Sequence, residues 1–126
     1  NFLELLYEKY YMDKRGEQKE GETPTQFEPI FAYTNNELNL RYQREYIVDG
    51  HIKQNSPLSK DQILTFDFLD KTMREEAWNI SYTLKSGDMM FSNNNRLIHD
   101  RNKFEDFEEE YLKRTLVRCW IRENVE

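Results

Sequence analysis

The spacing of apolar side chains in the first part of the chain predicts a helix followed by a β-hairpin. Residues 1–12 carry their apolar side chains close to a helical period. The charged run 13–25 contains turn-forming residues and predicts an exposed loop. Residues 27–34 and 38–42 are rich in β-formers on either side of the turn signal Asn35–Asn36, so we expect them to pair as antiparallel strands.

A helix in the middle of the chain has the clearest signature. Ser59 and Gln62 have the spacing of a capping box, in which each side chain satisfies a backbone amide of the other. The apolar stripe that follows has helical spacing and consists of Ile63, Phe66, Leu69 and Met73. We expect this helix to end near Glu75. Before it, residues 46–48 are predicted to extend the second hairpin strand, Asp49–Gly50 to break that strand, and 51–57 to form a loop.

Three more strands are predicted in the second half of the chain. Residues 80–84 alternate between apolar and polar side chains, 86–88 predict a turn, and 89–92 return as a strand. Residues 113–122 form the last strand. Its two faces are Thr115, Val117, Cys119 and Ile121 on one side, and Arg114, Leu116, Arg118 and Trp120 on the other.

Bulk composition narrows the class of protein. The chain has 126 residues, enough for one domain, and a net charge of −6 with both signs interspersed, which argues against a nucleic-acid groove. It has no apolar run that would span or target a membrane. The single Cys119 excludes an intrachain disulfide framework and fits a reducing compartment, so we expect a cytoplasmic protein. We interpret the start at Asn1, within a helical pattern, as a cut or processed end.

Arg114 and Arg118 form a candidate anion clamp. They point to the same side of the predicted strand, about 13 Å apart at their Cα atoms. Because Leu116 and Trp120 share that face, we expect it to be partly enclosed, and enclosed guanidinium groups need anions. Ion pairs with the chain's many acidic residues would meet this need. A small dicarboxylic acid held bidentately would meet it as well.

His99 is a candidate metal ligand because a neutral imidazole binds iron well. A lone histidine is also commonly a structural or surface residue. A facial iron site takes two histidines and one carboxylate. The other histidine, His51, lies in a predicted loop beside Lys53, which cannot be the carboxylate. The sequence therefore supplies no complete triad, and we assign no catalytic residue.

Other residues are weaker candidates for a catalytic or binding role. Cys119 has apolar neighbours on its face of the strand, so we expect a buried, inert thiol. Asp67 and Asp70 lie on the predicted helix without a partner that would make them an acid–base pair. The polar and aromatic cluster of Arg41, Tyr42 and Arg44 is interpreted as a solvated strand edge in preference to a pocket wall.

The residues around His99 also occur in a specific order. They are Gly87, Asp88, Phe91, Asn93, Asn94, Leu97, Arg101, Phe104, Glu105 and Asp106, followed by Arg114, Leu116, Arg118 and Trp120. A weaker upstream set consists of Leu5, Tyr11, Asp13, Arg15, Gly16, Pro29, Phe31, Leu38, Arg41, Tyr42, Tyr46 and Ile47. Together they resemble the C-terminal half of the taurine dioxygenase-like family of iron(II)- and 2-oxoglutarate-dependent oxygenases.

The resemblance implies a fold, a reaction and site residues. The fold would be mainly β with flanking helices, part of a double-stranded β-helix that is related to the jelly roll. The reaction would couple oxidative decarboxylation of 2-oxoglutarate to oxidation of a small-molecule substrate. His99 would be the distal Fe(II) ligand, and Arg114 would bind the distal carboxylate of 2-oxoglutarate. Arg118 would lie nearer the metal and hold the co-substrate or an anionic primary substrate. The division of roles between the arginines stays open, because the insert 102–113 varies in length across the family.

The chain departs from the family in lacking the upstream His-x-Asp or His-x-Glu pair. We therefore interpret residues 1–126 as the C-terminal portion of one oxygenase domain, inactive alone and completed by an N-terminal segment. An alternative is a non-catalytic β-sandwich fragment or interaction module that keeps the family pattern. A third is a sugar- or protein-binding jelly roll unrelated to oxygenases. We expect neither nucleic acid nor membrane as a partner.

Overall fold

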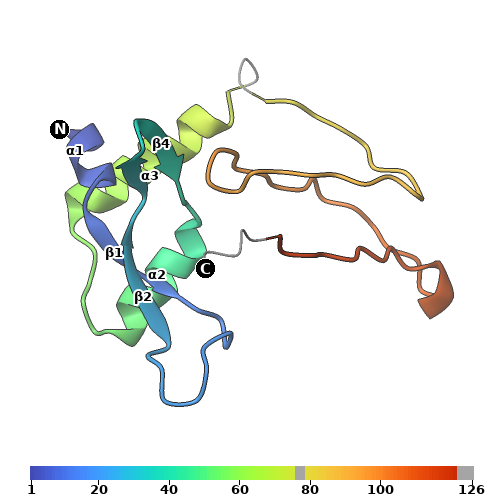
Figure 1. Ribbon diagram of the computed structural model, residues 1–126, viewed down its shortest axis with the longest axis horizontal. Helices are drawn as coiled ribbons and strands as arrows, with labels where there is room; N and C mark the ends of the chain where they lie inside the picture. Colours follow the sequence, from blue (N-terminus) through green and yellow to red (C-terminus); the bar gives the residue numbers. More distant parts are fainter. Residues whose placement is uncertain (76–78, 122–126) are drawn as a thin grey trace.

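The computed structural model describes residues 1–75 and 79–121. In Figure 1 the helices and paired strands gather in residues 1–75, which we call the packed unit. Residues 79–121, which we call the arm, extend away from it. The elements in chain order are α1 (Phe2–Leu6), β1 (Lys9–Asp13), β2 (Thr25–Pro29), β3 (Phe31–Thr34), β4 (Glu37–Leu40), α2 (Arg44–Lys53), α3 (Lys60–Met73) and the 3-10 turn η2 (Glu110–Leu112).

Strand β1 replaces the second half of the helix predicted for residues 1–12. Helix α1 ends at Leu6, and β1 pairs antiparallel with β2, with Tyr11 opposite Phe27. Along β1 the side chains of Tyr10 and Met12 are buried, so burial follows the two-residue period of a strand. The helical prediction is therefore right only for Phe2–Leu6.

The predicted hairpin forms between β3 and β4, whereas residues 27–29 of its predicted first strand belong to β2 and pair with β1 instead. Thr34 pairs with Glu37, and the two-residue loop between them is Asn35–Asn36. Asn35 has φ of 52° and Asn36 has φ of 63°. Two positive φ angles give the turn that matches the twist of a tight hairpin, and asparagine tolerates them better than most residues. The turn chemistry in the sequence thus identified the hairpin correctly.

Helix α2 contradicts the sequence prediction for its region. The predicted strand extension at 46–48 and the loop predicted from residue 51 both fall within α2 as far as Lys53. Gly50, interpreted as a breaker, is the point where the helix crosses β1: a Cβ there would lie 2.4 Å from the carbonyl oxygen of Tyr11. Tertiary packing against β1 therefore decides the conformation here, over the local turn signal.

Helix α3 is predicted well. The capping box is present, with the Ser59 hydroxyl accepting from the Gln62 N–H and the Gln62 side chain accepting from the Ser59 N–H. Phe66 is fully buried, whereas Ile63 at the start of the predicted stripe is 41% exposed. The helix ends at Met73, two residues before the predicted end. Like the other helices in the described ranges, it is too short or too polar to span a bilayer.

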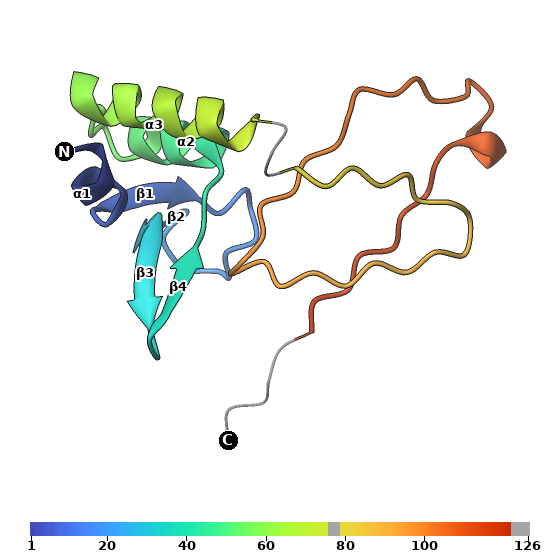
Figure 2. The ribbon, with the colours of Figure 1, turned by 90° about the horizontal axis from the view of Figure 1, so that it is seen from above.

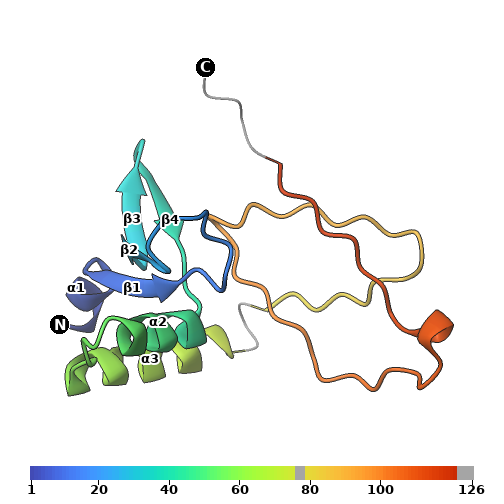
Figure 3. The same ribbon diagram turned by 90° about the horizontal axis from the view of Figure 1, so that it is seen from below.

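The packed unit has its own hydrophobic core. Figure 3 shows α2 and α3 on one side of β1 and the β3–β4 hairpin on the other. The buried residues are Leu6, Tyr10, Met12, Ile30, Ile47 and Phe66, with Phe31, Tyr42, Leu58 and Leu69 packed around them. At its centre the rings of Tyr10 and Phe66 meet edge to face, 5.2 Å apart at their centroids.

The arm runs out from the packed unit and back twice, as Figures 2 and 3 show. A turn closed by the Asp88 N–H on the Lys85 carbonyl reverses it first, in agreement with the turn predicted at 86–88. The strands predicted at 80–84, 89–92 and 113–122 are not formed in the part of the arm that the structure describes. Position 122 lies outside that part. Residues 80–84 illustrate the physical reason: Ile80 is 97% exposed, and a strand needs a paired neighbour and a covered face. The double-stranded β-helix stays a prediction.

Candidate metal and co-substrate site

His99 lies in the arm just after a turn of asparagines. The Asn93 carbonyl oxygen accepts from the N–H groups of Arg96 and Leu97, at 2.9 and 3.0 Å, which reverses the chain before His99. The His99 side chain is exposed. Its ring is therefore open to a ligand from outside the described residues.

The described residues do not fit an iron site by themselves. Within residues 1–75 and 79–121, no three His, Cys, Asp or Glu side chains lie close enough together to hold a metal ion. A competent facial site takes three protein ligands, and one exposed imidazole binds Fe(II) weakly. What the described chain can offer such a site is one nitrogen donor.

Arg114 is held by two residues of the segment that precedes it. Its backbone N–H donates to Asp106 Oδ1 at 3.0 Å, and its guanidinium carbon lies 5.2 Å from the centroid of the Phe104 ring. The guanidinium carbon of Arg101 lies at the same distance from that ring. Phe104 thus gathers Arg101 and Arg114, a relationship that the sequence pattern did not identify.

Arg118 lies against a different ring. Its guanidinium carbon is 5.5 Å from the centroid of the Trp120 ring. The face that we expected to be partly enclosed is open, because Leu116 is 60% exposed and Trp120 is 63% exposed. The buried thiol predicted for Cys119 is wrong for the same reason: no layer of the described residues packs on this segment, and Cys119 is exposed.

The predicted site residues are therefore only partly brought together. Arg114 and Arg118 are on one segment but contact separate aromatic rings. Among the hydrogen bonds and ion pairs of the described ranges, none joins His99 to either arginine. The structure leaves all three side chains exposed.

His51 has a structural role. The Tyr11 N–H donates to its Nε2 at 3.2 Å, and its Nδ1 lies 2.6 Å from the Ser56 carbonyl oxygen. An acceptor at Nε2 and a donor at Nδ1 define one neutral tautomer that satisfies both contacts. Because the ring is buried and both nitrogens are used, His51 ties α2 to β1 and to the loop after the helix.

A charged network joins the start of α2 to α3. The Tyr42 hydroxyl donates to Asp70 Oδ1 at 2.8 Å, and Arg44 donates to Asp70 Oδ2 at 2.6 Å. Arg44 also pairs with Asp67 at 2.7 Å. Burial, and then the hydrogen bond to Asp70, raises the pKa of Tyr42. The prediction of a solvated strand edge is wrong here, although the three-residue spacing of Asp67 and Asp70 on one helix face could have signalled the pair.

A second charged cluster fixes the end of β1. Asp13 is buried and accepts from Lys53 Nζ at 2.7 Å and from the Arg15 N–H at 3.0 Å. The hydrogen bond from Lys53 is the largest cause that lowers the pKa of Asp13. The Arg15 side chain pairs with Asp49 at 2.8 Å and lies over the Tyr46 ring.

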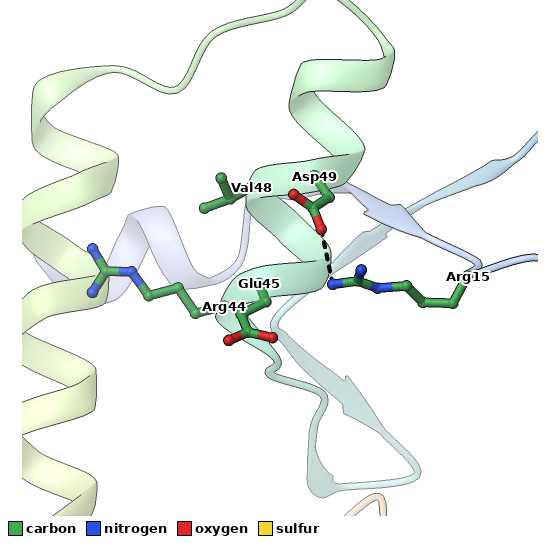
Figure 4. A pocket seen from close by; sticks show the side chains of 5 residues that line it. All are labelled: Arg15, Arg44, Glu45, Val48 and Asp49. Atoms are coloured by element: carbon green, nitrogen blue, oxygen red, sulfur yellow. Dashed lines mark ion pairs between the residues drawn. The ribbon is translucent and has the colours of Figure 1, made fainter.

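Two shallow surface depressions adjoin these clusters. The one in Figure 4 has a volume of about 410 Å³ and is lined by Arg15, Arg44, Glu45, Val48 and Asp49. The other has a volume of about 430 Å³ and is lined by Arg44, Asp67, Asp70, Lys71 and Arg74. Arg15 pairs with Asp49 in the first depression, and Arg44 pairs with Asp67 and Asp70 in the second.

Comparison with known proteins gives one informative relative. No model of a protein family matches the chain. The chain is 32% identical over 127 residues to FR-33289 synthase of Streptomyces rubellomurinus (strain ATCC 31215). The match covers 98% of this chain, and thus both the packed unit and the arm, but only 37% of the synthase. The chain is therefore similar to part of a longer protein that is named as a synthase.

Proposed function

We propose that the chain is the C-terminal portion of an iron(II)- and 2-oxoglutarate-dependent oxygenase that oxidises a small molecule. The observation that carries the proposal is the ordered set of residues around His99 and the two arginines. The similarity to FR-33289 synthase supports it, because the match runs through the packed unit and the arm together.

In this proposal three side chains of the arm contribute to the site. His99 supplies one imidazole ligand, and Arg114 binds the distal carboxylate of 2-oxoglutarate. Arg118 holds the co-substrate or an anionic primary substrate. The exposure of all three side chains supports these roles, because they are accessible to ligands. Iron, when bound, would supply the oxidative chemistry, and its other ligands would come from a preceding segment of the same domain.

The composition of the arm supports a sheet that is completed by another segment. Large apolar side chains point into solvent along its whole length, among them Phe91 at 77% and Val117 at 85% exposure. Such side chains are normally covered, since burial of apolar surface is the main stabilising term in folding. Strands of a preceding segment would both pair with the extended backbone and cover these residues.

A non-catalytic interaction module is the second candidate. The self-contained core of the packed unit favours it, because such a unit can persist without a metal site. The reading frame upstream of Asn1 distinguishes the two. An open frame that encodes a His-x-Asp or His-x-Glu pair supports the oxygenase, and a start codon directly before Asn1 supports the module.

The direct test is metal binding by the polypeptide expressed from the complete reading frame. Calorimetric titration with Mn(II) in the presence of 2-oxoglutarate should show one site. His99→Ala should abolish it with an unchanged far-UV circular dichroism spectrum, and Asn102→Ala, a nearby control, should bind normally. Wild-type Mn(II) affinity in His99→Ala would remove His99 from the site.

A further inference from the structure

The ring of Phe104 is contacted by two guanidinium groups that approach from different parts of the arm. The guanidinium carbons of Arg101 and Arg114 each lie 5.2 Å from its centroid. Arginine is attracted to the face of an aromatic ring at this distance. Phe104 itself is 46% exposed, so the cluster lies at the surface and a ligand can reach it.

The two cations are close enough to repel each other. Because both lie 5.2 Å from one point, their guanidinium carbons are at most about 10 Å apart, which is near the Debye length at about 0.1 M salt. Within residues 1–75 and 79–121, no carboxylate forms an ion pair with either guanidinium. An anion bound between the two groups would relieve this repulsion.

Asp106 fixes the backbone of Arg114 without neutralising the charge of its guanidinium group. Its Oδ1 accepts from the backbone N–H of Phe107 at 3.1 Å and from that of Arg114 at 3.0 Å. These bonds bring the chain after η2 back beside Phe104. The Asp106 carboxylate therefore accepts from backbone N–H groups, and the guanidinium group of Arg114 stays available to an anion.

We propose that Arg101, Phe104 and Arg114 form one anion-binding unit, in which the ring positions both guanidinium groups around a carboxylate. Arg101 is the second cation of this unit, and Phe104 is a positioning residue. The identity of the acid, the distal carboxylate of 2-oxoglutarate, rests on the proposed function. The pairing of the two guanidinium groups around Phe104 does not depend on that function. Arg118, on the separate ring of Trp120, lies outside the unit.

Nuclear magnetic resonance of arginine Nε–Hε groups tests the unit on the whole 126-residue chain. Titration with 2-oxoglutarate should shift the signals of Arg101 and Arg114 together, with one dissociation constant. The dimethyl ester of 2-oxoglutarate, which carries no free carboxylate, should shift neither. Arg101→Gln should weaken 2-oxoglutarate binding about tenfold, as expected for loss of a charged hydrogen-bond donor.

Substitutions of Phe104 test whether its ring positions the two guanidinium groups or only lies near them. Phe104→Leu should remove the ring-current displacement of both Nε–Hε signals and weaken 2-oxoglutarate binding about two- to fivefold. Phe104→Tyr should restore both. The matched control Phe107→Leu, on a ring that is 60% exposed, should change neither.

The outcomes distinguish this inference from the proposed function. Unchanged Arg101 and Arg114 signals in Phe104→Leu, or unchanged affinity in Arg101→Gln, would overturn the unit. If inorganic phosphate shifts both signals and 2-oxoglutarate shifts neither, the anion-binding unit stands and the oxygenase proposal fails. If neither anion shifts them, the unit is overturned.

Discussion

The backbone N–H of Leu40 donates to the carbonyl oxygen of Asn95 across 2.9 Å and joins the end of β4 to the arm. Beside this bond Arg96 pairs with Glu37 of the same strand. The Asn93 side chain accepts from the Asn95 N–H at 3.0 Å and holds the turn in shape. The polar asparagine run therefore docks the arm on the packed unit, four residues before His99.

Loosening this turn should expose the Leu40 amide to exchange with solvent. Asn93→Ala removes the side-chain acceptor, which is typically worth about 1 kcal/mol, so exchange of the Leu40 amide should accelerate about fivefold. Glu37→Gln should have a smaller effect, because exposed ion pairs contribute about 0.2–1 kcal/mol. Hydrogen–deuterium exchange followed by NMR measures both. Equal Leu40 exchange in Asn93→Ala and the wild type would contradict the docking role.

Gly50 should not tolerate a side chain. Gly50→Ala places a Cβ 2.4 Å from the Tyr11 carbonyl oxygen and 2.9 Å from the Asp13 amide nitrogen. Because both neighbours are backbone atoms of β1, the helix or the strand has to move, and we expect a loss of about 1–3 kcal/mol in the free energy of unfolding. Urea unfolding measures the loss. The control Glu45→Ala, at an exposed position of α2, should change stability little, and a similar stability in both variants would contradict the close contact.

Replacement by alanine should lower the stability of the fold at His51 but not at His99. His51→Ala leaves the Tyr11 N–H and the Ser56 carbonyl without their partner, so unfolding should become easier by about 2 kcal/mol or more. His99→Ala, at an exposed position, should leave the unfolding midpoint unchanged. Denaturant titration of the two variants in parallel checks both expectations. A larger destabilisation by His99→Ala would reverse the assignment of structural and ligand roles.

Asp13 should make the packed unit sensitive to acid. Its folded-state pKa lies below the ordinary value of 3.8, mainly because Lys53 donates to its carboxylate. The stabilisation is therefore complete above pH 3.8 and is lost as the pH falls through the lower, folded value. Asp13→Asn should be less stable than the wild type at neutral pH, and its stability should vary less below pH 4. Unfolding curves between about pH 2 and 6 provide the test, and parallel pH profiles would show that Asp13 is not the group responsible.

If the proposed oxygenase is correct, Arg114→Ala should mainly raise the concentration of 2-oxoglutarate that the complete enzyme requires. A charged hydrogen-bonded anchor contributes about 1.5–3 kcal/mol, which corresponds to a tenfold or greater rise in the half-saturating concentration. Arg118→Ala should act more on the primary substrate. Steady-state kinetics with each substrate varied in turn separates the two, and an unchanged 2-oxoglutarate requirement in Arg114→Ala would move the anchor to Arg118.

The sequence predicted best those elements whose signals are local. The Asn35–Asn36 turn and the Ser59–Gln62 capping box specify their own backbone geometry within a few residues, and both are present. Helix α2 was predicted wrongly because Gly50 reads locally as a breaker. Its actual role, close approach to the backbone of Tyr11, depends on a strand far away in the sequence.

The candidate site was also predicted only as far as local sequence signals reach. Sequence order identified His99 and Arg114 as residues that could bind a metal and an acid. The contact of Arg101 and Arg114 with one ring is a tertiary relationship that no spacing rule supplies. The alternation in 113–122 predicted a strand, but a strand also requires a neighbour, and none pairs with this segment in the described ranges.

The open arm has a practical consequence for work with the chain. Its extended segments combine β-branched and aromatic residues, such as Ile80, Tyr82 and Val117, with backbone groups that lack ladder partners in the described structure. Intermolecular strand pairing uses these same features. Concentrated preparations will therefore tend toward aggregation, and low protein concentration will favour dispersed monomers.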